Sequence, residues 1–586
     1  MILLRKNIIK SVLICVNLWF LILSLAEAKF HFAIIGDNTG GHEPGILLQV
    51  LTEIERLNPD FVICVGDLIE GYSQNPKEIQ AQWDTLQTIL KILNEPFYFV
   101  PGNHDIQDEM SEKIYIKNTC VQPHYSFNYQ NNHFIVLDNS RFESGEEISA
   151  EQWNWLKDDL EKNKNAENVF CFFHKPFWAE ALEQKKNTEK WHELFKQYGV
   201  KGVFSGHWHS YFRTFWDGIN YTAVGSSGAS LKEDLPRGKF YQFLWVTVDG
   251  KSVQITPIKL GNIFSSDILT FYEREEIKFI ESTSLEISPI TLPEKGKDNR
   301  FSFTVKIKNL RDTLLEGELK CEQINPAWTI TPTQAKYSLA PGAEMPLHFL
   351  ATLKDNSLLY PLPSFTTEYP YGKDKVCKME KRLFVHKIGS CSKVGKPPVI
   401  DGLLDDNCWG KIKPLKTFGA MDGSVTKVEP TEIYLGYDEQ NLYIAARCYE
   451  SHPEKIKTEA AKRDELTIAG DDYLWFFFDA DSDQKTYDQL IVNANGIIFD
   501  RRCKFEQGKS TKDIIWNGNW QIKTVKTNKD WTLELSIPLN NLTETGKLAK
   551  TWGMNIRRLQ NSTVDYADWQ PTVEHNPTKF GELIFK

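Results

Sequence analysis

The chain has 586 residues, of which 41% are hydrophobic and 25% are charged, so it has ample material for packed cores and no signature of disorder. This length predicts about three or four domains. The formal net charge of -10 argues against nucleic acid as an obligate partner, because binding to a phosphate backbone needs clustered Lys and Arg.

Residues 1–28 have the pattern of a secretion signal. Arg5, Lys6 and Lys10 form a basic start, an apolar stretch follows over residues 11–25, and Ala26-Glu27-Ala28 has the form of a cleavage site. The sequence therefore predicts cleavage near Ala28 and an exported protein, whether periplasmic, cell-surface or secreted. Retention as an uncleaved anchor stays open, although the apolar stretch is shorter than the ~20 residues of a usual spanning helix. Export makes the remaining cysteines candidates for disulfides whose connectivity the sequence does not give.

Residues 29–272 alternate strand and helix patterns. Apolar strand runs end just before Gly36, Gly66, Pro101, His174 and Gly206, and helical patterns lie around residues 46–57, 79–93, 151–161 and 189–198. The tail from 211 to about 258 reads as β-hairpins. In open α/β sheets ligands collect at the carboxyl ends of the strands, which is where the chemically active residues of this segment stand.

Five strand ends carry side chains that could bind metal. They deliver Asp37, Asp67, Asn103, His174, His207 and His209. This mixed oxygen and nitrogen set suits Fe, Mn or Zn, and two such ions can hold a phosphoryl group and activate a hydroxide. His104 beside Asn103 can donate a proton, and the following Asp105 is expected to orient the His104 ring.

These motifs, Gly36-Asp37, Gly66-Asp67, Gly102-Asn103-His104-Asp105, His174 and Gly206-His207-Trp208-His209, resemble those of the calcineurin-like metallophosphoesterases, which include the purple acid phosphatases. The resemblance implies an α/β fold in an αββα sandwich and hydrolysis of phosphomonoesters or diesters by metal-bound hydroxide. It further implies that Asp67 bridges two divalent or trivalent metal ions. Asp37 and His209 would complete one site, and Asn103, His174 and His207 the other, with His104 facing the phosphate.

Two positions depart from that family pattern. Thr39 stands where the family commonly has a His, and Glu70 stands where purple acid phosphatases have a Tyr. The first metal site is thus short of one ligand. His42, after Gly40-Gly41, is the nearest replacement, and the competing interpretation is that it is a polar loop residue in front of a helix.

The helical period disappears from about residue 275, and the rest of the chain is predicted to be all-β. Residues 273–388 read as an Ig-like β-sandwich spacer, and 389–586 as a second β-sandwich. The stretch Ile400-Asp401-Gly402-Leu403-Leu404-Asp405-Asp406 with Cys408-Trp409 resembles the opening of family 9 carbohydrate-binding modules. That resemblance implies aromatic rings against a sugar, for which Trp516, Trp520 and Trp569 are the candidates, whereas Trp409, Trp475 and Trp531 are expected in the core.

The sequence as a whole predicts an exported multidomain hydrolase with a dinuclear metal centre, a phosphoester substrate, and a module that binds polysaccharide or envelope glycan. The alternative is a non-catalytic envelope glycan-binding protein with a degenerate phosphoesterase scaffold, for which Thr39 is the best support. An intact Asn103-His104 pair argues against that alternative.

Overall fold

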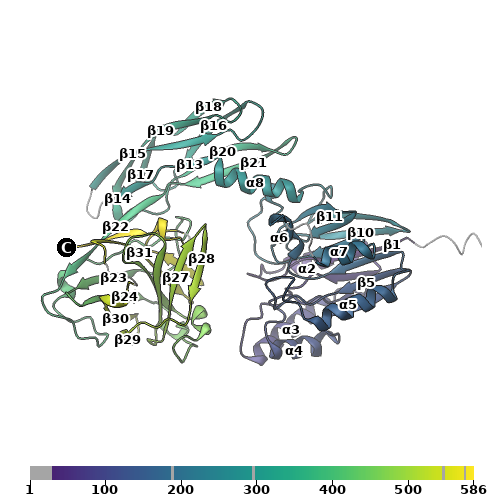
Figure 1. The fold of residues 1–586 in the computed structure, drawn as a ribbon, viewed down its shortest axis with the longest axis horizontal. Helices are drawn as coiled ribbons and strands as arrows, with labels where there is room; N and C mark the ends of the chain where they lie inside the picture. Colours follow the sequence, from purple (N-terminus) through teal and green to yellow (C-terminus); the bar gives the residue numbers. More distant parts are fainter. Residues whose placement is uncertain (1–28, 186–189, 293–296, 544–547, 573–575) are drawn as a thin grey trace, which may run out of the picture. The chain divides into compact units, whose positions relative to one another are not determined.

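The structure is a computed structural model that describes residues 29–185, 190–292, 297–543, 548–572 and 576–586 (Figure 1). The predicted signal, residues 1–28, lies outside the described residues. The chain divides into two compact units: the first runs up to Phe279 and includes Pro370–Cys377, and the second comprises Ile280–Tyr369 and Lys378–Lys586. No helix among the described residues is both long and apolar enough to cross a membrane.

Two six-stranded sheets form the centre of the first unit, in the orders β12-β11-β10-β1-β2-β3 and β4-β5-β6-β7-β9-β8. Their strands are β1 Phe30–Ile35, β2 Phe61–Cys64, β3 Phe97–Tyr98, β4 Tyr125–Tyr129, β5 Asn132–Val136, β6 Asn168–Phe172, β7 Gly202–Ser205, β8 Phe212–Trp216, β9 Ile219–Ala223, β10 Gln242–Asp249, β11 Ser252–Lys259 and β12 Asn262–Ile263. Within each sheet the strands that precede the candidate residues are parallel, β1-β2-β3 in one and β5-β6-β7 in the other. Their carboxyl ends therefore open at one edge of each sheet.

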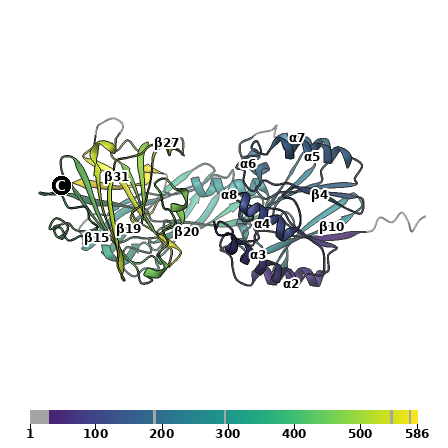
Figure 2. The ribbon, with the colours of Figure 1, turned by 90° about the horizontal axis from the view of Figure 1, so that it is seen from below.

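Helices cover the outer faces of both sheets. The helices of this part of the chain are α2 Ile46–Leu57, α3 Pro76–Leu90, α4 Glu109–Thr119, α5 Ala150–Lys162, α6 Phe177–Glu183 and α7 Lys190–Gln197, and α8 Phe271–Thr283 follows the last strand. In Figure 2, α2 and α3 lie on one side of the strands and α5 and α7 on the other. Between the sheets the rings of Phe61 and Phe134 meet edge to face at 5.2 Å, and Phe32 and Phe170 at 5.7 Å. The predicted αββα sandwich is thus confirmed.

Local sequence explains where two of these helices begin. The Asn75 side chain accepts a hydrogen bond from the backbone N–H of Lys77, and Pro76 occupies the first position of α3, where its missing N–H costs nothing. At α4, Asp108 and Ser111 form a reciprocal capping box. Both helices follow loops that carry candidate residues, so the caps hold those loops in place.

Helical structure was expected to end at about residue 275, but one further helix, α8, continues beyond that residue. Helix α8 extends through Thr283 and buries Phe271, Ile277 and Ile280. The boundary predicted between 272 and 273 falls inside this helix. Its buried apolar residues are separated by charged residues, mainly Glu, and are too irregularly spaced to form a clear periodic pattern in the sequence.

The second unit begins with a small β-sandwich of two four-stranded sheets, β13-β15-β19-β17 and β18-β16-β20-β21. The strands are β13 Leu285–Ile287, β15 Lys297–Lys308, β16 Leu315–Glu322, β17 Trp328–Thr331, β18 Gln334–Leu339, β19 Glu344–Asp355, β20 Ser364–Tyr371 and β21 Lys375–Arg382. Its core includes Phe303, Phe349 and Phe365, whose ring centroids lie 5.1 to 5.6 Å apart. The all-β prediction for this segment is confirmed.

The rest of the second unit is a larger sandwich, whose strands form the path β28-β27-β26-β25-β31-β33-β22-β23-β24-β30-β29 with β14 and β32 attached. They are β14 Ile290–Leu292, β22 Val385–Lys393, β23 Thr431–Tyr437, β24 Asn441–Tyr449, β25 Tyr473–Asp479, β26 Thr486–Asn493, β27 Ile498–Glu506, β28 Lys509–Asp513, β29 Gln521–Lys526, β30 Asp530–Pro538, β31 Thr551–Gln560, β32 Asp565–Asp568 and β33 Gly581–Phe585. Strand β22 pairs with both β33 and β23, and the boundary predicted at 388/389 falls inside it.

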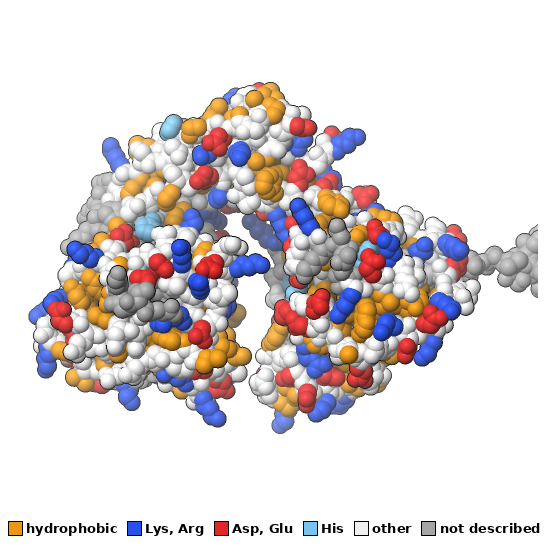
Figure 3. Space-filling view, viewed as in Figure 1, with side chains coloured by type: hydrophobic (Ala, Val, Ile, Leu, Met, Phe, Trp, Pro, Cys, Tyr) orange, Lys and Arg blue, Asp and Glu red, His pale blue; other side chains and the backbone are white. Residues whose placement is uncertain are grey.

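All nine described cysteines are free thiols, so the structure forms none of the disulfides considered from the sequence. Most of them, including Cys64 and Cys171, are buried and pack as small apolar residues. On the face shown in Figure 3, basic and acidic side chains are interspersed over both units.

Candidate metal centre

The close contacts around Asp67 and His174 require glycine at positions 66 and 102. A Cβ on Gly102 would lie 2.1 Å from Asp67 Oδ1, and one on Gly66 would lie 2.7 Å from His174 Nδ1. Gly66 also has a φ of 98°, a backbone conformation that side chains disfavour. The glycines of the sequence motifs therefore let the strand ends approach one another closely.

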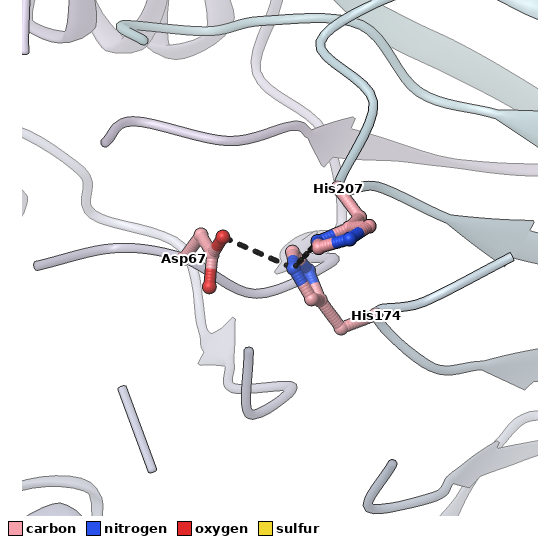
Figure 4. A group of neighbouring side chains, drawn as sticks. All are labelled: Asp67, His174 and His207. Atoms are coloured by element: carbon pink, nitrogen blue, oxygen red, sulfur yellow. Dashed lines mark hydrogen bonds and ion pairs between the residues drawn. The ribbon is translucent and has the colours of Figure 1, made fainter. Parts of the chain in front are cut away.

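His174 lies at the centre of the group (Figure 4). Its Nδ1 donates to the carbonyl oxygen of Val65 at 2.8 Å, so Nε2 is the atom that faces the site. Three further atoms surround Nε2, namely Asp67 Oδ2 at 3.0 Å, Asn103 Oδ1 at 3.0 Å and His207 Nδ1 at 3.2 Å.

A single N–H on His174 Nε2 can donate a well-aligned hydrogen bond to only one of these three atoms. Carboxylate, amide and imidazole acceptors that converge on a single proton have the composition of a cation site. Asp67, His174 and His207 each place a ligand atom within 4.8 Å of the others. The donor set thus fits a metal ion.

The electrostatics of these groups agree with that interpretation. Burial raises the pKa of Asp37 to about 7, and its Oδ2 atom is buried without a hydrogen-bond partner among the described residues. For Asp67 burial opposes ionisation, but the charge and hydrogen bond of His174 bring its pKa down to about 2. Without metal, His174 supplies the positive charge that these buried carboxylates require.

The second predicted subset, Asp37 and His209, also comes together. His209 Nε2 lies 3.8 Å from Asp37 Oδ1, and that oxygen accepts from the His207 backbone N–H at 2.8 Å. Gly40 packs on the His209 ring, where a Cβ would lie 2.5 Å from Cε1. All six residues predicted from the strand ends therefore meet at one place, and metal binding by them stays a prediction.

The structure does not bring His42 into this group. Its side chain is exposed, its backbone N–H donates to Glu70 Oε1 at 2.9 Å, and no contact among the described residues joins its ring to Asp37 or His209. Gly40 and Gly41 have φ angles of 95° and 88°, in the region that favours glycine. After Asp37, the loop carries two buried side-chain oxygens without a hydrogen-bond partner among the described residues, Asn38 Oδ1 and Thr39 Oγ1.

The role predicted for Asp105 is wrong. Its buried carboxylate accepts hydrogen bonds from the backbone N–H groups of Gly102, Asp67 and Leu68 at 2.8 to 2.9 Å and of Ile69 at 3.3 Å. It therefore joins the Asp67 loop to the Gly102 loop and does not orient the His104 ring. Adjacency in the sequence did not predict the partner of Asp105, because backbone N–H groups compete with the neighbouring imidazole for a buried carboxylate.

A backbone carbonyl orients His104 instead. His104 Nδ1 lies 2.7 Å from the carbonyl oxygen of Glu70, and its backbone N–H donates to Asp67 Oδ1 at 2.9 Å. With Nδ1 protonated and engaged, Nε2 is the atom available for proton transfer. No sequence signal identifies such a partner, because every residue carries a carbonyl.

Sequence reasoning also missed Arg274 of α8. Its guanidinium lies 4.5 Å from the ring of Trp208, which separates His207 and His209 in sequence. These two histidines have φ angles of 74° and 50°, in a region that costs non-glycine residues about 1–3 kcal/mol each. Trp208, stacked on Phe212 at 5.6 Å and covered by Arg274, helps to hold this strained segment.

We therefore expect Arg274→Ala to lower metal affinity by about tenfold, because supporting contacts around ligands typically contribute that much. Titration calorimetry with Mn²⁺ measures the effect. Lys278→Ala is the matched control, since its ammonium lies 6.0 Å from the same ring and pairs with the same Glu183. If Arg274→Ala bound Mn²⁺ as tightly as Lys278→Ala does, Arg274 would not have the supporting role given to it.

The three candidate carbohydrate residues differ in exposure. Trp569 is 2% exposed and packs in the core against Gly581, so its assignment as a sugar-stacking ring is wrong. Trp516 and Trp520 are half-buried in the loop between β28 and β29 and meet edge to face at 5.8 Å. Trp409, Trp475 and Trp531 are buried, as predicted.

Trp520 and Trp516 have different roles in that loop. Trp520 donates from Nε1 to the buried Asp500 at 2.8 Å, and Gly518 packs against its ring. The Arg502 guanidinium lies 4.5 Å from the ring of Trp516, beside the exposed Ile515. Trp520 thus supports the loop, and Trp516 is the better candidate for a ligand contact.

Comparison with known proteins follows the same division of the chain. The family described as calcineurin-like phosphoesterase matches residues 30–211, and the family described as carbohydrate family 9 binding domain-like matches residues 400–586. The serine/threonine-protein phosphatase CPPED1 of Homo sapiens is 26% identical over 211 residues, which cover 32% of this chain and 66% of that protein. The chain thus spans slightly less than two thirds of the length of that relative.

Two further similarities concern one domain each. The 3',5'-cyclic adenosine monophosphate phosphodiesterase CpdA of Haemophilus influenzae is 26% identical over 201 residues, covering 32% of this chain and 68% of that protein. A solved family 9 carbohydrate binding module of Caldicellulosiruptor kristjanssonii, in complex with cellotriose, is 20% identical with a TM-score of 0.24, covering 34% of this chain and 94% of that chain.

The relatives CPPED1 and CpdA are named as a phosphatase and a phosphodiesterase, which agrees with the predicted class of metal-dependent phosphoric ester hydrolase. The chain therefore contains an N-terminal calcineurin-like metallophosphoesterase domain and a C-terminal carbohydrate-binding family 9 domain.

Proposed function

We propose that this chain is an exported phosphoesterase that uses two metal ions, and that its last domain holds it at polysaccharide or envelope glycan. The convergence of Asp67, Asn103 and His207 on His174 Nε2 is the observation that carries the hydrolytic part. Asp37 and His209 would hold the second ion of the Fe, Mn or Zn class.

Two bound cations would neutralise charge on the phosphoryl group and supply an activated water. The chain's own contribution to proton transfer comes from His104. Its Nδ1–H is held by the Glu70 carbonyl, so a protonated ring presents Nε2–H toward the departing oxygen of the ester. The contact from the His104 backbone to Asp67 keeps this ring beside the Asp67 carboxylate.

Metal analysis of the purified protein, together with a chromogenic screen of phosphomonoesters and phosphodiesters, tests this function. About two metal ions per chain and hydrolysis of at least one ester class are expected. A folded protein that binds glycan but retains no metal and hydrolyses no ester would support the alternative of a degenerate scaffold. The feature that supports this alternative is Thr39, which stands where the family commonly has a histidine ligand.

For the glycan-binding domain, Trp516→Ala in the full chain should weaken binding to a soluble polysaccharide by about tenfold or more. Stacking covers roughly half of the ~200 Å² of a Trp side chain, which at ~25 cal/mol/Å² corresponds to about 2–3 kcal/mol before ordering costs. Affinity electrophoresis over a panel of polysaccharides measures the change. Tyr566→Ala, at a 45% exposed ring of the same unit, is the control that should leave binding unaltered.

Export rests on the pattern of residues 1–28. Protein recovered from secreting cells should begin near Lys29, which N-terminal sequencing detects. A mature chain that still carries residues 1–28 would favour the uncleaved anchor.

A further inference from the structure

Tyr72 occupies an unusual place at the mouth of the metal centre. It is 60% exposed and has a φ of 47°, a left-handed conformation that is uncommon for a bulky side chain. The preceding Gly71 lies so close to His104 that a Cβ would come within 1.8 Å of the His104 carbonyl oxygen. The loop after Asp67 therefore packs closely against the Asn103-His104 turn. Tyr72 follows Gly71 directly, and its side chain is largely exposed.

The hydroxyl of Tyr72 determines which way the Asn103 amide faces. Asn103 Nδ2 donates to Tyr72 Oη at 2.9 Å, while Asn103 Oδ1 points to His174 Nε2 at 3.0 Å. The terminal torsion of an asparagine is broad and close to two-fold, so the amide can turn over at little cost. Tyr72 Oη accepts the NH₂ group and thus favours the orientation in which the oxygen faces the metal site.

The ring of Tyr72 meets His104 edge to face, with centroids 4.7 Å apart and an interplanar angle of 81°. The His104 imidazole is therefore held by two contacts, the Tyr72 ring and the hydrogen bond from Nδ1 to the Glu70 carbonyl. The remaining ring surface is open to solvent beside the residue that faces the departing group. A planar group leaving the phosphorus could pack on that surface.

We propose that Tyr72 is both a positioning residue for Asn103 and a specificity residue that favours phosphoesters with planar, aromatic leaving groups. The two parts use different atoms, the hydroxyl for Asn103 and the ring for the substrate. The second part rests on the proposed function, because it requires that phosphoryl compounds bind at this centre.

Two substitutions separate the hydroxyl from the ring. Tyr72→Phe keeps the ring and removes the hydroxyl, and Tyr72→Leu removes both. Titration calorimetry with Mn²⁺ reports on Asn103 without any turnover. Binding of phenylphosphonate and methylphosphonate to the Mn²⁺-loaded protein reports on the ring, and neither compound is hydrolysed.

Both variants should bind Mn²⁺ about tenfold more weakly, the usual effect of losing a hydrogen bond behind a ligand. Tyr72→Phe should keep the wild-type preference for phenylphosphonate over methylphosphonate. Tyr72→Leu should reduce that preference by about threefold to tenfold, the range of an aromatic contact. Tyr198→Phe, whose hydroxyl bonds Glu161 outside the site, is the matched control.

Wild-type Mn²⁺ affinity in Tyr72→Phe would overturn the positioning role. An unchanged preference between the two phosphonates in Tyr72→Leu would overturn the specificity role. A wild-type protein that binds Mn²⁺ and phosphonates but hydrolyses no ester would refute the proposed function alone. Circular dichroism distinguishes these outcomes from misfolding, which is not expected at a side chain this exposed.

Discussion

His207→Ala should lower phosphoesterase activity by at least about a hundredfold, with the fold retained. His207 Nδ1 is one of the three atoms around His174 Nε2, and its backbone N–H, which the substitution keeps, donates to Asp37. The variant therefore removes a proposed metal ligand and keeps the backbone contact of this loop with Asp37. Initial rates on the best ester of the screen, with metal content determined on the same sample, measure the effect.

His124→Ala is the control for this substitution, because its ring packs on Trp155 in the same unit and away from the centre. It should keep full activity and full metal content. Exhaustive chelation should abolish the wild-type activity, and added metal should restore it. Activity that survives chelation would rule out a metal-dependent mechanism.

Asp105→Ala should destabilise the first unit by about 3–5 kcal/mol, a large part of the stability of a typical domain. The substitution leaves four backbone N–H groups, including those of Asp67 and Gly102, without their acceptor in a buried place. Because those N–H groups belong to the loops that carry the ligands, metal binding should be lost as well. Differential scanning calorimetry of the full chain should show an earlier transition for this unit.

Asp84→Ala provides the comparison, since that carboxylate is exposed on α3 and accepts one hydrogen bond from Gln80. Its transition should coincide with that of the wild type. If Asp105→Ala unfolded at the wild-type temperature, the carboxylate would not be what joins the two loops.

The sequence by itself determined the elements and the place of the centre. Strand runs that end at Gly36-Asp37, Gly66-Asp67, His174 and Gly206-His207 correspond to β1, β2, β6 and β7, and the helices predicted between them are present as α2, α3, α5 and α7. Such runs are readable because their apolar residues are buried on both faces of each strand, a constraint that acts at every position. In the last domain, β25 has the same character because all its residues are buried, whereas β23 mostly alternates buried and half-buried residues.

Tertiary structure decided which partner each side chain takes. Asp105 bonds backbone N–H groups in place of the adjacent imidazole, His104 bonds a carbonyl, and His42 stays outside the centre. Arg274 of α8 covers the ring of Trp208, and Tyr72 in the Asp67 loop accepts a hydrogen bond from Asn103. Trp569 and Trp516 both lie in sequence that resembles a loop, yet Trp569 is in the core and Trp516 is half-buried. These outcomes depend on hydrogen-bond and packing competition between segments distant in sequence, which a local pattern does not encode.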